Sequence, residues 1–395
     1  MASSEQTPSF RKRARVKIGQ IQGTRPSLYN NQLLVSTGIP SLDSFIGGGL
    51  AVGTVLLLEE DIYGTYTRLM LKYYLAEAVL TKQSIFISSA DESTEKLLKE
   101  LPASVDSETQ SSHPVSSSNI NAETTTADKD DKMKIAWRYQ NQKKVQGPPS
   151  ISQFGHYYDL TRTMDPSLLD PDLISHGPSI DLDSSSSASE SPPHMNKHYQ
   201  KLLMSIRDKI RQGGFSTSHQ AEKRSILRIG IHSLGSSLWD DDCDATSDET
   251  RASSASLMLF LLALRAELRS ALATALITVP AHLFQDRAVV QRIERLCDTV
   301  VRIESFAGSE KEKNPVFKDY HGLVYVIQIP RLNSLVPAQL ETPDLAFKLR
   351  RKKFTIERLH LPPELSSSTE FGGGVDIARG SACGSSSSSS SKLAF

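Results

Sequence analysis

Five short runs of apolar residues recur along this chain, and they constrain its fold more than any other feature. Each run is nearly continuous instead of alternating with polar residues, which is typical of a strand covered on both faces. Strands of this kind occur almost entirely in parallel sheets. The predicted strands are Thr54–Leu58, Ser84–Ser88, Ile226–Ile231, Thr274–Val279 and Thr299–Ile303.

Segments with helical spacing of apolar residues lie between these strands. They are Leu69–Leu80, Tyr199–Arg211, Ser256–Ala273 and Asp286–Leu296. This alternation predicts an α/β domain whose central, mostly parallel sheet is flanked by helices. Leu323–Ile329 and Phe354–Ile356 are later predicted strands, for which an antiparallel arrangement is open.

Polar, low-complexity stretches divide the chain into ordered and disordered parts. We predict one folded domain over residues 21–363, preceded by a basic arm (1–20) and followed by a Gly/Ser-rich tail (364–395). Within the domain, Ser-, Asp- and Pro-rich insertions hold too few large apolar residues to offset the entropy of ordering, so we predict disorder there. These insertions lie at about 102–132, 164–195 and 240–255.

Composition excludes several classes of protein. The 45 basic and 45 acidic side chains cancel, so any affinity for nucleic acid must come from local patches. Cys243, Cys297 and Cys383 are scattered, which argues against a disulfide framework or a zinc site and fits a reducing compartment. The longest apolar run, around Leu257–Leu264, is far short of the roughly 20 residues that span a bilayer. We therefore expect no metal and no membrane.

The segment Ser36–Leu58 resembles the beginning of the RecA-like ATPase core. Its TGIPSLDSFIGGGL stretch predicts a helix followed by a glycine turn, and VGTVLLL is the first core strand. A phosphate loop, GxxxxGK[ST], should come next, before the following helix. In such a loop the backbone N–H groups surround the phosphates, the Lys reaches the outer phosphates and the Ser or Thr holds magnesium.

The window where this loop should lie has lost nearly all of its characteristic residues. Only Gly64 remains, while Glu59 replaces the first Gly, Thr65 the Lys, and Tyr66 the Ser or Thr. Three carboxylates stand where an anion would bind, and like charges a few ångströms apart cost on the order of several kcal/mol. The altered positions are Glu59, Glu60, Asp61, Gly64, Thr65 and Tyr66.

The second expected nucleotide position is altered as well. The strand ILRIGI should end in an Asp that supports magnesium, but it ends in His232, within GIHSLGS. Magnesium prefers oxygen ligands, so His is a poor substitute. The two losses together indicate a degenerate phosphate loop and no catalytic residue in this chain. The alternative is that both segments are ordinary strand–helix turns that never bound a nucleotide.

Three stretches resemble the family of Elongator complex subunit 4 proteins. They are Gly23–Asp61, the segment Lys134–Arg162 with KIAWRYQ and FGHYYDLTR, and GIHSLGS. The resemblance covers most of the predicted ordered chain, and the Ser-rich insertions and the tail lie outside it. It implies a RecA-like fold without functional Walker motifs.

The resemblance also implies partners and a process. Elongator subunits 5 and 6 join this subunit in a heterohexameric ring with two copies of each, and the ring binds tRNA. The ring joins the catalytic Elongator subcomplex, which makes the 5-carbonylmethyl-type modification of wobble uridine. The chain would then be an accessory subunit, not an enzyme, in the cytoplasm and nucleus. It would hold no cofactor of its own, although ATP at a ring interface stays open.

Two other functions fit the same fold. One is an active RecA-like nucleotide hydrolase that acts on nucleic acid. The other is a RecA-like scaffold that binds only protein partners. Hydrolysis of ATP by the isolated chain would favour the first, and absence of tRNA binding would favour the second.

Two basic runs are candidates for RNA contact, because clustered cations neutralise phosphates. The alternatives are a solvated arm and a charged strand edge. The first run is also a candidate nuclear-localisation signal. The candidate residues are Arg11, Lys12, Arg13, Lys348, Arg350, Arg351, Lys352 and Lys353.

An aromatic cluster is a candidate for stacking on bases, although we favour a structural role for it. Its members are Trp137, Tyr139, Phe154, Tyr157 and Tyr158.

Overall fold

A computed structural model describes most of the predicted domain. The described residues are 21–27, 32–105, 154–178, 195–219, 224–239, 247–330, 332 and 344–360. All of them except His360 belong to one compact unit, Met1–Leu359.

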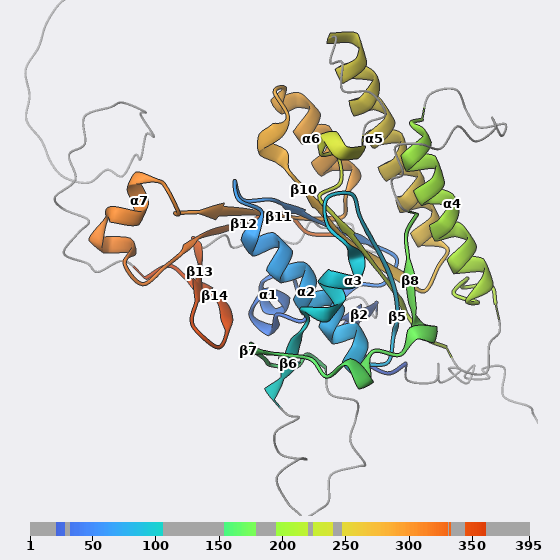
Figure 1. Cartoon of the computed structure of the whole chain (residues 1–395), viewed down its shortest axis with the longest axis horizontal. Helices are drawn as coiled ribbons and strands as arrows, with labels where there is room; N and C mark the ends of the chain where they lie inside the picture. Colours follow the sequence, from blue (N-terminus) through green and yellow to red (C-terminus); the bar gives the residue numbers. More distant parts are fainter. Residues whose placement is uncertain are drawn as a thin grey trace, which may run out of the picture. The chain divides into compact units, whose positions relative to one another are not determined.

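A nine-stranded sheet forms the centre of this unit (Figure 1). Its strands are β4 (Val55–Glu59), β5 (Ser84–Ser89), β8 (Ile174–His176), β9 (Leu227–His232), β10 (Ala273–Val279), β11 (Thr299–Ser305), β12 (Gly322–Gln328), β13 (Leu345–Leu349) and β14 (Phe354–Arg358). They are ordered β14-β13-β12-β11-β4-β10-β9-β5-β8. The pairs from β11 to β8 are parallel, and β12, β13 and β14 extend the sheet in antiparallel fashion. The prediction of a mixed α/β fold with a mostly parallel sheet is confirmed.

Helices cover both faces of the sheet, as the continuous apolar runs predicted (Figure 1). They are α1 (Pro40–Phe45), α2 (Thr65–Leu80), α3 (Thr94–Lys99), α4 (Lys197–Gln212), α5 (Ser247–Arg269), α6 (Arg287–Leu296) and the short α7 (Glu310–Lys313). Along β4, Leu56 and Leu58 pack into one core with α1, α2 and α3, while Val55 and Leu57 pack into a second core with α4, α5 and α6. None of the described helices combines the length and apolarity needed to cross a bilayer.

Two small sheets flank the central one. One has the order β1-β2-β3, and the other pairs β6 with β7. Their strands are β1 (Thr24–Pro26), β2 (Leu33–Val35), β3 (Leu50–Ala51), β6 (Pro102–Ser104) and β7 (Tyr158–Thr163).

The structure differs from the prediction of disorder at about 164–195. Residues up to 178 are described, and Ile174–His176 form β8, a parallel edge strand beside β5. Two short 3-10 helices precede β8, and each starts with an Asp-Pro pair. The carboxylates of Asp165 and Asp170 accept backbone hydrogen bonds from Ser167 and Asp172, at 2.9 and 3.0 Å. Asp as a cap and Pro in the first turn are strong local signals that a prediction from composition overlooks.

The other two predicted insertions also contain described structure. Pro102–Ser104 form β6, and α5 starts at Ser247 instead of Ser256. The polar first turns of α5 extend a helix whose later part is buried, and a prediction that follows the apolar pattern misses them. The arm at 1–20, the tail at 364–395 and the rest of these insertions lie outside the described residues.

The central strands should dominate stability. Ile277 in β10 is fully buried between neighbouring parallel strands, whereas Ile327 in β12 is 36% exposed. We expect Ile277→Ala to lower the free energy of unfolding by about 2–5 kcal/mol, because it removes buried methyl groups and leaves a cavity. Ile327→Ala is the matched control and should cost clearly less. Urea unfolding of both variants tests this, and equal losses would contradict the buried position of β10.

Candidate nucleotide site and basic pocket

The turn between β4 and α2 carries the predicted phosphate-loop positions. Gly64 ends it in the left-handed conformation, with φ 61°, and its N–H donates to the Asp61 carbonyl at 2.8 Å. Asp61 is only 2% exposed, and its carboxylate accepts a hydrogen bond from the Tyr66 N–H at 3.1 Å. Helix N-termini bind anions through such N–H groups. At α2 that anion is a carboxylate of the chain itself.

Glu59, the last residue of β4, is held by an ion pair on the β11 side. The guanidinium of Arg302 donates from Nε to Glu59 Oε2 at 2.6 Å and from Nη2 to Glu294 Oε1 at 3.0 Å. Two carboxylates therefore share one guanidinium. Burial, followed by the neighbouring Glu59, raises the pKa of Glu294 to about 7, despite the charge of Arg302.

The remaining positions lie in a pocket, at the exposed start of α2 and against the end of the sheet. Thr65 is exposed at the first turn of α2, and the Tyr66 ring packs on Phe347 with the centroids 4.5 Å apart. Glu60, Gly64 and His232 line a common pocket of about 470 Å³. The two predicted nucleotide positions, the turn after β4 and the end of β9, thus come together.

This pocket lies where the parallel strands end. Glu60, Asp91, His232 and Pro280 line it, and they lie at or just after the carboxyl ends of β4, β5, β9 and β10. Ligands of open α/β sheets bind in the crevice at this edge. The position therefore suits a ligand, and the charges decide which kind.

The charged side chains of this pocket form ion pairs with one another. Arg68 and Lys96 both pair with Glu92, at 2.5 and 3.0 Å, and His232 Nδ1 lies 2.9 Å from Asp91 Oδ1. Burial alone would raise the pKa of Asp91, but the hydrogen bond and charge of His232 outweigh it and lower the pKa to about 2.

Glu60 adds a further carboxylate at the same pocket. It accepts a hydrogen bond from Thr278 at 2.6 Å, and burial raises its pKa. Three carboxylates therefore face two cations there, histidines aside, so the pocket offers a triphosphate no excess of positive charge. Among the residues that the structure describes, no cluster of His, Cys, Asp or Glu is arranged to hold a metal ion.

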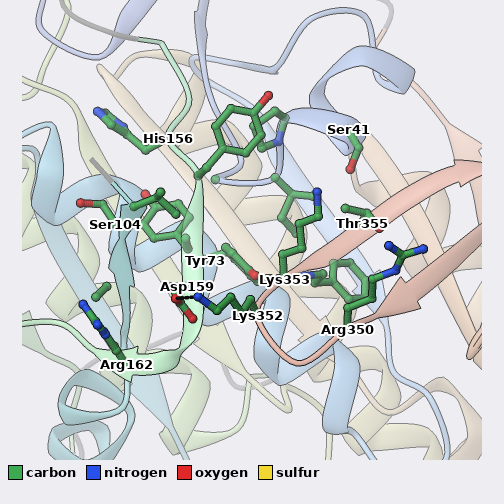
Figure 2. Close-up of a pocket in the computed structure, with 18 of the residues that line it drawn as sticks. Ser41, Tyr73, Ser104, His156, Asp159, Arg162, Arg350, Lys352, Lys353 and Thr355 are labelled. Atoms are coloured by element: carbon green, nitrogen blue, oxygen red, sulfur yellow. Dashed lines mark hydrogen bonds and ion pairs between the residues drawn. The ribbon is translucent and has the colours of Figure 1, made fainter. Parts of the chain in front are cut away.

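A second pocket, of about 780 Å³, brings the predicted basic run together with the aromatic segment. Five cationic side chains and one carboxylate line it. Figure 2 shows Arg162 of β7 and Arg350 of the β13–β14 turn on opposite sides of the Asp159–Lys352 ion pair, whose atoms are 3.6 Å apart. We call this site the basic pocket.

The β13–β14 turn displays four consecutive cations, residues 350–353. Backbone hydrogen bonds between Arg350 and Lys353, at 2.9 and 3.2 Å, close the turn, and all four side chains are exposed. Lys348 does not line the pocket, because it forms an ion pair with Glu357 and lies 4.3 Å from the Tyr320 ring centroid. Arg11, Lys12 and Arg13 lie outside the described residues.

A buried carboxylate anchors the aromatic segment. Glu77 of α2 accepts hydrogen bonds from the His156 backbone at 3.1 Å and from the Tyr158 hydroxyl at 2.7 Å. Burial alone would raise the pKa of Glu77, but the His156 hydrogen bond and the nearby Arg228 lower it. Tyr157, between these anchors, is 64% exposed and lines the basic pocket.

The rest of the aromatic cluster lies elsewhere. The ring of Phe154 packs under the Arg25 guanidinium at 3.9 Å, which supports the structural role that we favoured for it. Trp137 and Tyr139 fall outside the described part of the chain.

Several residues of the two sites were not predicted from the sequence. They are Arg162, Asp91 and Arg302. His232, which pairs with Asp91, and Glu59, which pairs with Arg302, are far from these residues in the chain, so no local pattern indicates the pairs. Asp61 was predicted only as a repulsive carboxylate. Its bond to Tyr66 carries no N-cap signal in the sequence, because the residue at the N-cap of α2 is Gly64 and Asp61 lies three residues before it.

Comparisons with known proteins find relatives along nearly the whole chain. The family model described as PAXNEB protein matches residues 17–395. Elongator complex protein 4 of Danio rerio is 48% identical over 393 residues, which cover 98% of this chain and 96% of that protein. The protein of the same name in Homo sapiens is 46% identical over 373 residues, or 92% and 84% of the two chains. That of Saccharomyces cerevisiae is 23% identical over 411 residues, or 93% and 80%.

The hydrogen bond from Tyr66 to Asp61 gives a stability prediction. We expect Asp61→Ala to lower the free energy of unfolding by about 1–3 kcal/mol, since it leaves the partly buried Tyr66 N–H without its acceptor. Asp61→Asn keeps an acceptor oxygen and should lose less. Urea unfolding at neutral pH measures both. Wild-type stability of Asp61→Ala would show that the carboxylate does not stabilise the start of α2.

Glu294 gives a pH prediction. Its pKa is raised to about 7 from an ordinary 4.5, so the folded state binds its proton more tightly than the unfolded state. The stability from this group is full below the unfolded pKa and is lost as the pH rises through the folded pKa. Glu294→Gln should therefore lose less stability than wild type between about pH 5 and pH 8 in urea unfolding. Glu95→Gln, at an exposed site, is the control, and an unchanged pH slope in Glu294→Gln would refute the shift.

Proposed function

This chain belongs to the PAXNEB protein family, and we propose that it serves as subunit 4 of an Elongator complex, as an accessory component of tRNA modification. The Danio rerio and Homo sapiens proteins that bear this name are 48% and 46% identical to this chain, over 98% and 92% of its length. In this role the chain contributes structure and binding, and a different subunit carries the chemistry.

The finer proposal concerns fold and assembly. The unit has a RecA-like fold and joins subunits 5 and 6 in a heterohexameric ring that binds tRNA and supports wobble-uridine modification. The parallel order β11-β4-β10-β9-β5, with a pocket at the carboxyl ends, supports the RecA-like assignment. The proposed places of action are the cytoplasm and the nucleus.

One observation carries the non-catalytic part of the proposal: the N-terminus of α2 holds Asp61 where a phosphate would bind. An external phosphate would have to displace a buried carboxylate and approach Glu60. Repulsion between such charges opposes binding. We accordingly propose that the chain holds no nucleotide alone, and that any ATP of the ring is bound mainly by neighbouring subunits.

The tRNA-binding part of the proposal is supported by the β13–β14 turn. Arg350, Arg351 and Lys353 form no ion pair with another described residue, so their charges are available to phosphates. In the pocket at the ends of the parallel strands, by contrast, carboxylates outnumber the lysine and arginine side chains. We therefore propose that RNA contacts this chain at the basic turn and not at the altered nucleotide site.

Reconstitution tests the assembly. We expect the full chain, mixed with subunits 5 and 6, to elute as one species whose mass equals two copies of each subunit, and to bind tRNA in a gel shift. Replacing Arg350 and Arg351 by Ala should weaken tRNA binding and make the slope of log affinity against log salt shallower, by about one for each phosphate that these side chains neutralise. Lys348→Ala, with its side chain engaged by Glu357, is the matched control.

Two outcomes would contradict the proposal. Failure to form a complex with subunits 5 and 6 would remove the ring. Magnesium-dependent ATP hydrolysis by the isolated chain, altered by charge reversal at Glu60, would favour the alternative of an active nucleotide hydrolase.

A further inference from the structure

We propose that the basic pocket holds one unpaired nucleotide of a bound RNA, with its base stacked on Tyr157 and its flanking phosphates on the β13–β14 turn. The inference rests on the proposed function, because it names the part of an RNA that this subunit contacts. It adds a specific site and a specific ligand class to that function.

The shape and lining of the pocket suit a base. Its volume of about 780 Å³ lies within the range of roughly 300–1,000 Å³ typical of small-molecule sites. Ile39, Tyr73, Tyr158 and Phe354 contribute apolar and aromatic surface to its walls. A base in a stacked duplex cannot enter a concave site of this kind, whereas an unstacked base of a loop or an end can.

The charge of the pocket suits the backbone of that nucleotide. The cations of the turn lie on one side and Arg162 on the other (Figure 2). Asp159, the single carboxylate of the lining, lies 3.6 Å from Lys352. Guanidinium groups bind phosphate oxygens through paired N–H donors, so the two sides can hold the phosphates before and after the base.

Tyr157 has the properties of a stacking platform. Its neighbours His156 and Tyr158 are both fixed to the fully buried Glu77, and its own carbonyl accepts the Val105 N–H at 2.9 Å. The backbone is thereby held in place. Tyr157 is nevertheless 64% exposed, and its hydroxyl makes no hydrogen bond to another described residue. Aromatic rings of this kind stack on bases of any sequence.

Charge and aromaticity together favour RNA over an acidic peptide. A peptide carboxylate would satisfy the cations of the turn, but it would leave the exposed ring of Tyr157 without a partner. A nucleotide can contact both, because its base can stack on the ring while the phosphate, a short distance away, binds the cations. The same pairing of aromatic rings and cations is found in single-strand binding proteins.

The experiment uses the full chain assembled with subunits 5 and 6, and two probes of equal length: a short oligouridylate and an abasic oligonucleotide. We expect Tyr157→Ala to weaken oligouridylate binding by about 5- to 150-fold, the value of one stacked base, and to leave the abasic probe unaffected. Tyr157→Phe keeps the ring and should bind as wild type. Arg350→Ala with Arg351→Ala should weaken both probes.

Further controls keep the outcomes distinct. The wild-type assembly is tested with whole tRNA, and the unfolding midpoint of Tyr157→Ala should equal that of wild type because the side chain is exposed. If tRNA binds but Tyr157→Ala leaves oligouridylate affinity unchanged, the nucleotide pocket is refuted and the proposed function stands. If, in addition, an acidic peptide displaces the oligouridylate, the pocket is a site for carboxylates instead. If the wild-type assembly binds no tRNA, the proposed function itself fails.

Discussion

The first N–H groups of a helix have no partner within the helix, and in α2 the carboxylate of Asp61 accepts one of them, that of Tyr66. That acceptor is covalently attached and buried, so it is present at a local concentration that a free anion cannot match. The strand–turn–helix unit keeps the geometry in which α/β proteins bind phosphates. Its ligand position is nevertheless satisfied from within. The carboxylates that line the pocket at this edge of the sheet would likewise repel a second anion.

The neighbouring charges follow the same pattern of internal pairing. Arg302 joins the end of β4 to α6 through Glu59 and Glu294, and Glu92 engages the cations of α2 and α3. Partly buried ion pairs contribute little net stability, because desolvation offsets the Coulomb attraction. These ion pairs fix which elements meet at the carboxyl ends of the strands. They also neutralise the charges of Arg68 and Lys96, which are then not available to an external anion.

Parts of this arrangement were predictable from the sequence, and the reason differs from part to part. The five central strands were predicted because strands buried on both faces are continuous apolar runs. The edge strand β8 was not, because its three residues lie within a Ser/Pro/Asp-rich stretch whose order depends on two Asp caps. Likewise, the cations of the run at 348–353 cannot be told apart in the sequence. In the fold they have different surroundings, since Lys348 pairs with Glu357 while the turn residues line the basic pocket.

The two pockets differ in charge although the chain as a whole has no net charge. At the strand ends, carboxylates and cations lie close enough to neutralise each other. At the β13–β14 turn, four cations are consecutive in sequence and the hairpin holds them together, whereas Asp159, the carboxylate among the described residues that line the pocket, forms its ion pair with Lys352. Long-range sheet pairing, not composition, therefore sets where positive charge accumulates on the surface. An α/β unit that satisfies its own nucleotide site and displays unpaired cations elsewhere is suited to hold a polyanion without hydrolysing a nucleotide to do so.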